Sequence, residues 1–166
     1  MDLNSVSGWY RLDYKEWVLF LKAKSHDGTL RSGHEHSDLI SFVLYYNGEI
    51  ILNDPGRLDY TNSSLSRYGV SPLAHNTLLL DGIGPEATKN PWFAKEYLEL
   101  NVKVTKEYDS TGYILKIKHN GFRRIANKDV RHQRILKLMV DEVLITDKLI
   151  GKGEYNMITR FHFLPK

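Results

Sequence analysis

The sequence predicts an all-β protein built as an antiparallel β-sandwich of two layers. Apolar and polar residues alternate with a period of two along most of the chain, which is typical of half-buried strands. These segments are rich in Tyr, Val, Ile and Phe and are separated by Gly, Asn, Asp or Pro. No window of a dozen residues keeps a helical period with a capping residue at its start. Many short strands at regular spacing favour a sandwich or a related two-sheet fold.

The expected strands are bounded by turn residues. They are Trp9 to Ala23, Ile40 to Tyr46, Glu49 to Leu52, Asn76 to Leu80, Tyr97 to Glu107, Tyr113 to His119, Arg131 to Val140, Val143 to Ile150 and Met157 to Phe163. Asn47-Gly48 lies between two apolar runs and is the strongest short signal for a hairpin. Residues 109–112 and 151–153 are expected to form similar turns. The least regular stretch, 58–94, is expected to contain the long loops.

Composition limits the kinds of site that the chain can build. Its 166 residues suffice for one domain with its own core, so we expect one β-sandwich over residues 1–166. Cysteine is absent, which leaves His and carboxylates as the strong metal ligands. The net charge of +3 and the pI of about 9.0 would favour an anionic polymer as partner without choosing one. Charge alone therefore does not exclude nucleic acid.

The segment Gly33-His34-Glu35-His36-Ser37-Asp38 carries the densest chemistry. On a strand, His34 and His36 would project from one face and could share a metal ion or a substrate. Asp38 would continue that face. The alternative is a pair of surface histidines with no common ligand, because this spacing alone is not diagnostic.

Two further candidates lie at the ends of expected strands. Asp54 directly follows one apolar strand, and His75 directly precedes another. Side chains from different strands converge at such ends, and His and Asp supply the N and O donors that zinc accepts. The alternative is that Asp54 only shapes a Pro-Gly turn and that His75 only caps the next strand.

These residues match two family patterns to different extents. Gly28, His34, His36 and Gly48 fit part of a cupin motif, but the acidic ligand expected after the second histidine falls on Ile40 or Ser41. The segments GHEHSDLISFVLYYNGEIILNDPGRLDY, YGVSPLAHNTLLLDG, RHQRILKL, ITDKLIG and RFHFLP together resemble the β-sheet domain of the heparinase II/III-like polysaccharide lyases. A cupin-like metalloenzyme remains the weaker alternative.

The resemblance implies half of a two-part lyase. In this family an N-terminal α/α toroid packs on a β-sandwich, with the substrate cleft between them, and only the second part would be present here. By similarity, His34 would be catalytic, Tyr68 would contact substrate, and His36, Asp54 and His75 would bind a structural zinc ion. The reaction implied is β-elimination on a uronic acid, with the principal catalytic groups on the toroid, so we expect the isolated chain to be inactive.

The same resemblance sets the expected partners. These are an anionic polysaccharide and the helical toroid of the same full-length protein, with no nucleic acid and no membrane, and a periplasmic or secreted location in a bacterium. A non-catalytic carbohydrate-binding or scaffold module is the other alternative, because it shares the fold but needs no intact His34.

Basic residues gather in the second half of the chain. They are Arg123, Arg124, Lys128, Arg131, His132, Arg134 and Lys137. Contact with an acidic sugar chain is one interpretation. A solvated strand face is favoured over it, because alternation would send the charges outward. A structural ion pair, for example with Asp147, is the third. His119 is expected to be structural.

Overall fold

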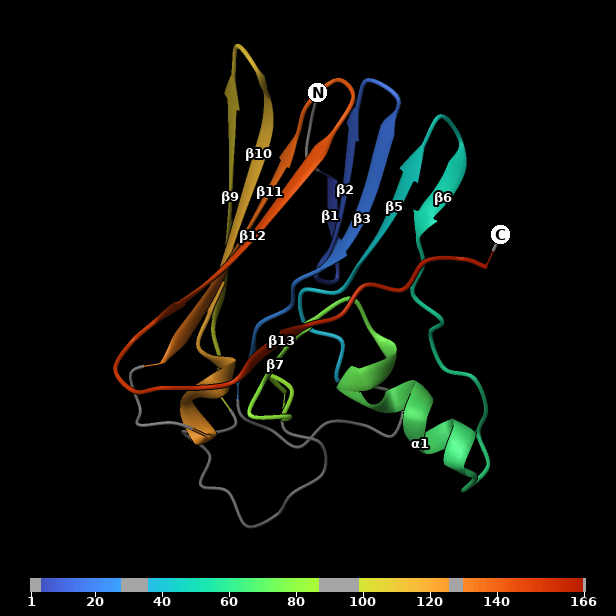
Figure 1. Ribbon diagram of the computed structural model, residues 1–166, viewed down its shortest axis with the longest axis vertical. Coiled ribbons are helices and arrows are strands. Elements are labelled where there is room, and N and C mark those ends of the chain that lie inside the picture. The colour runs from blue at the N-terminus through green and yellow to red at the C-terminus, as the bar shows by residue number, and fades with distance from the viewer. Residues whose placement is uncertain (1–3, 28–35, 87–98, 126–129, 166) are drawn as a thin grey trace.

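The computed structural model describes residues 4–27, 36–86, 99–125 and 130–165, and within them the strands form two main antiparallel sheets (Figure 1). The first sheet has the order β1-β2-β3-β5-β6, with bounds Asn4–Val6, Trp9–Tyr14, Trp17–Lys22, Phe42–Tyr46 and Glu49–Leu52. The second has the order β12-β11-β10-β9, with bounds Val143–Ile150, Arg131–Leu138, Gly112–His119 and Val102–Asp109. The predicted antiparallel sandwich is therefore confirmed.

Shorter elements lie mainly at the end of the sandwich opposite the hairpin tips (Figure 1). Two small sheets pair β13 (Met157–Thr159) with β7 (Leu78–Leu80) and β4 (His26–Asp27) with β8 (Glu99–Leu100). The helices are α1 (Ser64–Val70) and the 3₁₀ turns η1 (Pro72–Ala74) and η2 (Gly121–Arg124). Among the described residues, no helix is long and apolar enough to cross a membrane.

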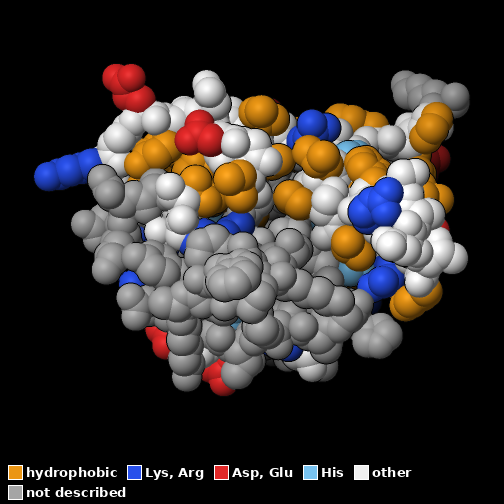
Figure 2. Space-filling model, turned by 90° about the horizontal axis from the view of Figure 1, so that it is seen from below, with side chains coloured by type: hydrophobic (Ala, Val, Ile, Leu, Met, Phe, Trp, Pro, Cys, Tyr) orange, Lys and Arg blue, Asp and Glu red, His pale blue; other side chains and the backbone are white. Residues whose placement is uncertain are grey.

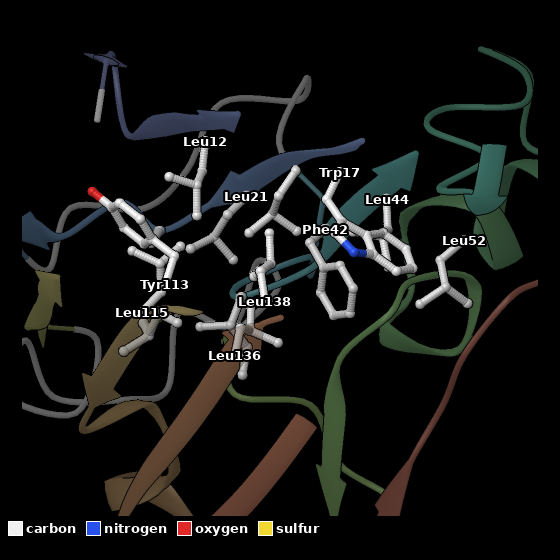
Figure 3. Packing of buried hydrophobic residues seen from close by; sticks show 14 of the residues in the cluster. Leu12, Trp17, Leu21, Phe42, Leu44, Leu52, Tyr113, Leu115, Leu136 and Leu138 are labelled. Carbon is white, nitrogen blue, oxygen red and sulfur yellow. The ribbon is translucent and has the colours of Figure 1, made fainter. Parts of the chain in front are cut away.

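The core lies between the inner faces of the two main sheets (Figure 3). Leu19, Leu21 and Phe42 come from the first sheet, and Leu115 and Leu136 come from the second; none of these five is more than 1% exposed. Burial alternates along β10 and β11, so every second side chain faces the core. Each such apolar side chain contributes roughly 1.5–3 kcal/mol when it leaves water.

The turn chemistry explains where the predictions succeed. Asn47 and Gly48 both have positive φ, 51° and 81°, as the type I′ hairpin between β5 and β6 requires. Residues 109–112 form the β9–β10 hairpin, as expected. The turn at 151–153 does not close a hairpin, because β13 pairs with β7 and leaves the sheet that contains β12.

The observed elements differ from the expected ones at several places. Within the expected strand Tyr97 to Glu107, β8 ends at Leu100 and β9 begins at Val102 in a different sheet. Trp9 to Ala23 is not one strand: a turn at Lys15, with φ of 52°, divides it into the hairpin β2–β3. β5 begins at Phe42 and not at Ile40, because Ile40 has φ of 59° and cannot lie in a strand. Helix α1 was missed because its seven residues are too few to show a helical period. Its N-cap is Ser63, whose side chain accepts a hydrogen bond from the backbone N–H of Ser66.

Candidate functional site

Asp54 and His75 form the centre of the site. Asp54 follows β6 and His75 follows η1, and His75 Nδ1 lies 3.0 Å from each carboxylate oxygen of Asp54. Ser41 Oγ donates to Oδ2 at 2.5 Å, and the Gly56 N–H donates to Oδ1 at 2.9 Å. Burial opposes the ionisation of Asp54, but these hydrogen bonds outweigh it and lower the pKa of the carboxyl group. The predicted convergence of the two residues is confirmed.

His36 lies beside this pair. Its ring is stacked on that of His75, with ring centroids 5.5 Å apart and 16° between the planes. Burial lowers the pKa of His36; the Asp38 carboxylate opposes this shift, and the neighbouring His75 adds to it. Asp38 itself is buried and forms an ion pair with Lys22 of β3, so it anchors the segment. His34 lies outside the described residues.

The segment from Ser37 to Ser41 is held in place from several sides. The backbone N–H of Ser37 donates to the Val70 carbonyl at the end of α1, at 3.0 Å. The buried Glu86 carboxylate accepts from the Leu39 N–H at 2.8 Å. These contacts hold Ile40 in its left-handed conformation, which is rare for a β-branched residue and costs roughly 1–3 kcal/mol. Such strain persists only where the surroundings impose it.

Asn76 connects the pieces of chain that carry the site residues. Its backbone N–H donates to Ser41 Oγ at 3.0 Å, and its Nδ2 donates to the carbonyls of Phe42 and Asn53 at 2.8 and 2.9 Å. Its Oδ1 accepts from the His162 N–H at 2.7 Å. The side chain is fully buried with every hydrogen-bonding group in use, so it fixes the position of His75 relative to Asp54. Asn76 is not among the site residues that the sequence predicts, although it directly follows His75.

Arg134 of β11 supports the same segments from inside the molecule. Its guanidinium is fully buried and donates to the carbonyls of Ile40 and Asn76 at 3.1 and 2.7 Å. It also binds both oxygens of Asp147 on β12 at 2.8 and 2.9 Å. This bidentate pair ties the second sheet to the backbone of the site. The solvated-face interpretation is therefore wrong for Arg134, and the structural ion pair with Asp147 is confirmed.

The other basic residues of that cluster separate into different environments. His132 is buried and its Nε2 donates to Asp147 at 2.8 Å, so it belongs with Arg134. Arg124 is held by backbone carbonyls, those of Gly84 and Pro85 among them, whereas Arg131 is exposed. Lys128 lies outside the described residues. The cluster is therefore not one solvated face.

Tyr68 is carried by α1, the helix that contacts Ser37. Its side chain is 40% exposed, and its hydroxyl donates to the Leu73 carbonyl at 3.5 Å, a long contact. Its helix is tied to the segment after His36 through Val70. Tyr68 is therefore placed near the site but is not bonded to its central residues.

The side chains that meet here are of the types that bind metal ions. In the described part of the chain, His75 Nε2 and His162 Nε2 are buried ring nitrogens without a hydrogen-bond partner. Such atoms are uncommon in native interiors, and a bound ion or water is one explanation for them. His36, Asp54 and His75 provide two imidazoles and one carboxylate, which suit zinc. As they stand, no three such side chains among the described residues are close enough together to hold a metal ion. His75 Nδ1 is directed to Asp54, which leaves Nε2 as the nitrogen without a partner.

The fold and the site define a class: a β-sandwich domain with a buried histidine–carboxylate site at the end of its sheets. Residues 3–166 match the family described as Heparinase II/III-like, C-terminal. The chain belongs to this family, which is a family of polysaccharide lyases, and it matches the C-terminal domain of those proteins. That membership decides between the two resemblances, and the cupin-like interpretation has no support.

Solved structures of the same fold come from whole lyases. A mutant of the heparan sulfate lyase HepC from Pedobacter heparinus aligns with a TM-score of 0.66 and 20% identity over 92% of this chain. A heparinase III with methylated lysines aligns with a TM-score of 0.65 and 18% identity over 91%. In both, the chain spans only 22% of the solved protein. No functionally curated protein is significantly similar in sequence.

Proposed function

We propose that this chain is the metal-binding β-sandwich domain of a lyase that cleaves uronic-acid-containing polysaccharide by β-elimination. The observation that carries the proposal is the buried Asp54–His75 pair, with its unpartnered Nε2, beside His36 in a heparinase-family domain. The solved proteins of this fold are named as a heparan sulfate lyase and as heparinase III. An anionic polysaccharide is accordingly the proposed substrate.

Zinc is the proposed metal, held by His36, Asp54 and His75. A bound zinc ion would supply positive charge that joins segments far apart in the sequence and so stabilises the domain. Asp54 is prepared for this role because its hydrogen bonds keep the carboxyl group ionised. Ser41 and Gly56 orient the carboxylate from outside the donor set, as neighbouring hydrogen bonds do in metal sites.

In the proposed reaction, a base removes the proton at C5 of the uronic acid unit. The electron pair of that C–H bond forms the C4–C5 double bond as the bond from C4 to the leaving oxygen breaks, and an acid protonates that oxygen. His34, two residues before the anchored His36, is proposed to act at this centre, and Tyr68 on α1 is proposed to contact the sugar. Proton transfer by positioned side chains is worth roughly 10²–10⁴-fold in rate.

A second domain is proposed to complete the cleft. Seen from below the view of Figure 1, hydrophobic side chains gather over the described surface, with basic side chains between them (Figure 2). Leu65 and Tyr68 on α1 and Leu73 on η1 are 52%, 40% and 38% exposed. Apolar residues grouped in this way are typical of an interface, and the solved relatives are several times longer than this chain. A helical toroid packed on this end is the proposed partner.

Zinc binding is testable directly. We expect the chain to bind about one zinc ion per molecule and His75→Ala to lose that ion, because Asp54 and His36 alone offer too few donors. His26→Ala is the matched control: His26 lies on β4, which pairs with β8 and not with the elements that carry Asp54 and His75, so its variant should keep the metal. Elemental analysis after chelator-free purification measures both. Zinc-free wild-type protein with no thermal shift on adding zinc would contradict the proposal.

The catalytic assignment requires the complete protein. We expect His34→Ala in that protein to lose release of unsaturated uronate from heparan sulfate or alginate while zinc content stays unchanged. The isolated chain should release none, because the base and the groups that neutralise the carboxylate are proposed to lie on the toroid. Absorbance of the unsaturated product measures both. Turnover by the isolated chain would refute the division of the site between two domains.

A non-catalytic carbohydrate-binding module remains the second candidate, because the β-sandwich alone serves both functions. Unchanged turnover of the His34→Ala protein would favour it. A periplasmic or secreted location is proposed with either function, because anionic polysaccharides of this kind lie outside the cytoplasm.

A further inference from the structure

A second concave site lies at one end of the four-stranded sheet. It is a cavity of about 760 Å³ where β9 begins and β10 ends. Its lining among the described residues consists of Asn101, Val102, Lys103, Lys118, His119, Asn120, Arg123 and Arg131. Four of these side chains are cationic and none is acidic. The cavity is formed without His36, Asp54 or His75, so it is separate from the site described above.

The cationic side chains that line this cavity lie close to one another and are not paired with carboxylates of the described residues. Lys103 and Lys118 are directly opposite each other on neighbouring antiparallel strands, an arrangement of like charges that destabilises a sheet. Within the described residues, neither lysine makes a side-chain hydrogen bond or an ion pair, and the same holds for Arg123 and Arg131. The four cationic side chains at this end therefore form no ion pair within the described part of the chain.

The other end of the same sheet face is built differently. Lys116 binds both oxygens of Glu107 at 2.7 Å, and Lys137 lies 3.3 Å from Asp109. These two lysines of the same sheet are thus paired with carboxylates, and the cavity at that end contains the acidic Glu107 in its lining. The absence of such partners around Lys103 and Lys118 marks their end as an anion-attracting surface.

The cationic row continues across the sheet. Lys118 is opposite Gln133 of β11, and Gln133 is opposite the exposed Lys148 of β12. Strands lie about 4.8 Å apart, so the row from Lys103 to Lys148 covers roughly 14 Å. An extended polyanion lying across the strands would meet several of these charges in turn.

We propose that this surface, defined by Lys103, Lys118, Arg123, Arg131 and Lys148, binds an anionic glycan chain outside the cleft. The inference rests on the proposed function for the choice of polymer and adds a second contact for it. The shared chemistry is a repeated sulfate or carboxylate on a sugar chain. Nucleic acid is disfavoured because no Phe, Tyr or Trp lines the described part of the cavity and its one imidazole, that of His119, is buried, whereas single strands are held largely by stacking on exposed rings.

The test measures binding of defined polyanions to the whole 166-residue chain by fluorescence anisotropy. Labelled heparin and alginate oligosaccharides of equal length are the probes. We expect Lys103→Gln/Lys118→Gln/Arg131→Gln to weaken heparin binding at least tenfold. Lys116→Gln/Lys137→Gln, which removes salt-bridged lysines from the same sheet, should change it less than twofold. Heparin binding alone would assign the site to sulfate, and binding of both probes would show that carboxylate suffices.

The results separate this inference from the proposed lyase function. His75→Ala should lose zinc and keep heparin binding, whereas the triple variant should keep zinc and lose heparin. Lys118→Gln alone should raise the Tm, because it relieves the like-charge pair. A triple variant with a Tm no lower than that of wild type excludes misfolding as the cause of lost binding. The inference is overturned if the triple variant binds like wild type, if wild type binds neither glycan, or if single-stranded DNA of equal charge binds more tightly.

Discussion

Replacing Arg134 by methionine is expected to lower the free energy of unfolding by about 3–5 kcal/mol, because it leaves a buried partner charge uncompensated. Asp147 is only 7% exposed in its side chain and would keep His132 and Thr159 as its remaining partners. The carbonyls of Ile40 and Asn76 would lose their buried donor as well. Urea unfolding followed by circular dichroism measures the change.

Arg131→Gln is the matched control for this prediction. Arg131 lies on the same strand, but its side chain is exposed and makes no hydrogen bond or ion pair among the described residues, so its variant should stay within about 0.5 kcal/mol of wild type. Arg134→Lys should recover only part of the loss, because an ammonium group cannot bind both Asp147 oxygens as the guanidinium does. Equal stability of the Arg134→Met and Arg131→Gln proteins would show that the buried pair contributes nothing.

Acid is expected to destabilise the domain from about pH 6.5 downward, because two buried histidines, His119 and His132, add to the effect of His36. The Gly121 N–H donates to His119 Nδ1 at 3.1 Å, so His119 carries its proton on Nε2, which donates to His132 Nδ1 at 3.0 Å. His132 Nε2 in turn donates to Asp147. Both imidazoles are therefore neutral, and protonating either one would set two donors against each other.

Burial lowers the pKa of His119 well below its ordinary value and also lowers the pKa of His132. The Asp147 carboxylate opposes both shifts, and the Arg134 charge adds to both. The unfolded chain takes up these protons near pH 6.5 and the folded chain only at lower pH. Between these limits the unfolded state binds more protons, so stability falls as the pH falls, by up to about 1.4 kcal/mol per pH unit for each histidine. Above pH 6.5 the full contribution is present.

Urea unfolding at a series of pH values checks this slope. His119→Gln should reduce the slope between pH 5 and 6.5, because one of the two groups no longer titrates. Asp109→Asn is the control: hydrogen bonds from Thr111 lower the pKa of Asp109 to about 2, so that variant should alter the profile only below about pH 4. A wild-type profile that is flat from pH 7 to 5 would contradict the neutral histidine pair.

The strands were predictable wherever local pattern and turn chemistry agree. Val143 to Ile150 was predicted with its observed bounds, and Asn47-Gly48 was predicted as a hairpin because few residue pairs accept two positive φ angles. The turn at Lys15 was not predictable in this way. Lysine carries no turn signal, and its left-handed conformation is imposed by the pairing of β2 with β3.

By itself, the sequence determined the sandwich, the absence of thiol chemistry and the candidate donors His36, Asp54 and His75. These follow from residue type and short-range period, which are local properties of a chain. Only the tertiary structure decided that Asp54 bonds His75 and that the buried Arg134 donates to the backbone of Asn76, next to His75. It also decided that Lys103 lies directly opposite Lys118 with no carboxylate of the described residues paired to either. Alternation predicts that a charged residue points outward. Whether it instead points inward to a buried carboxylate, as Arg134 does to Asp147, depends on strand register, and long-range pairing sets that register.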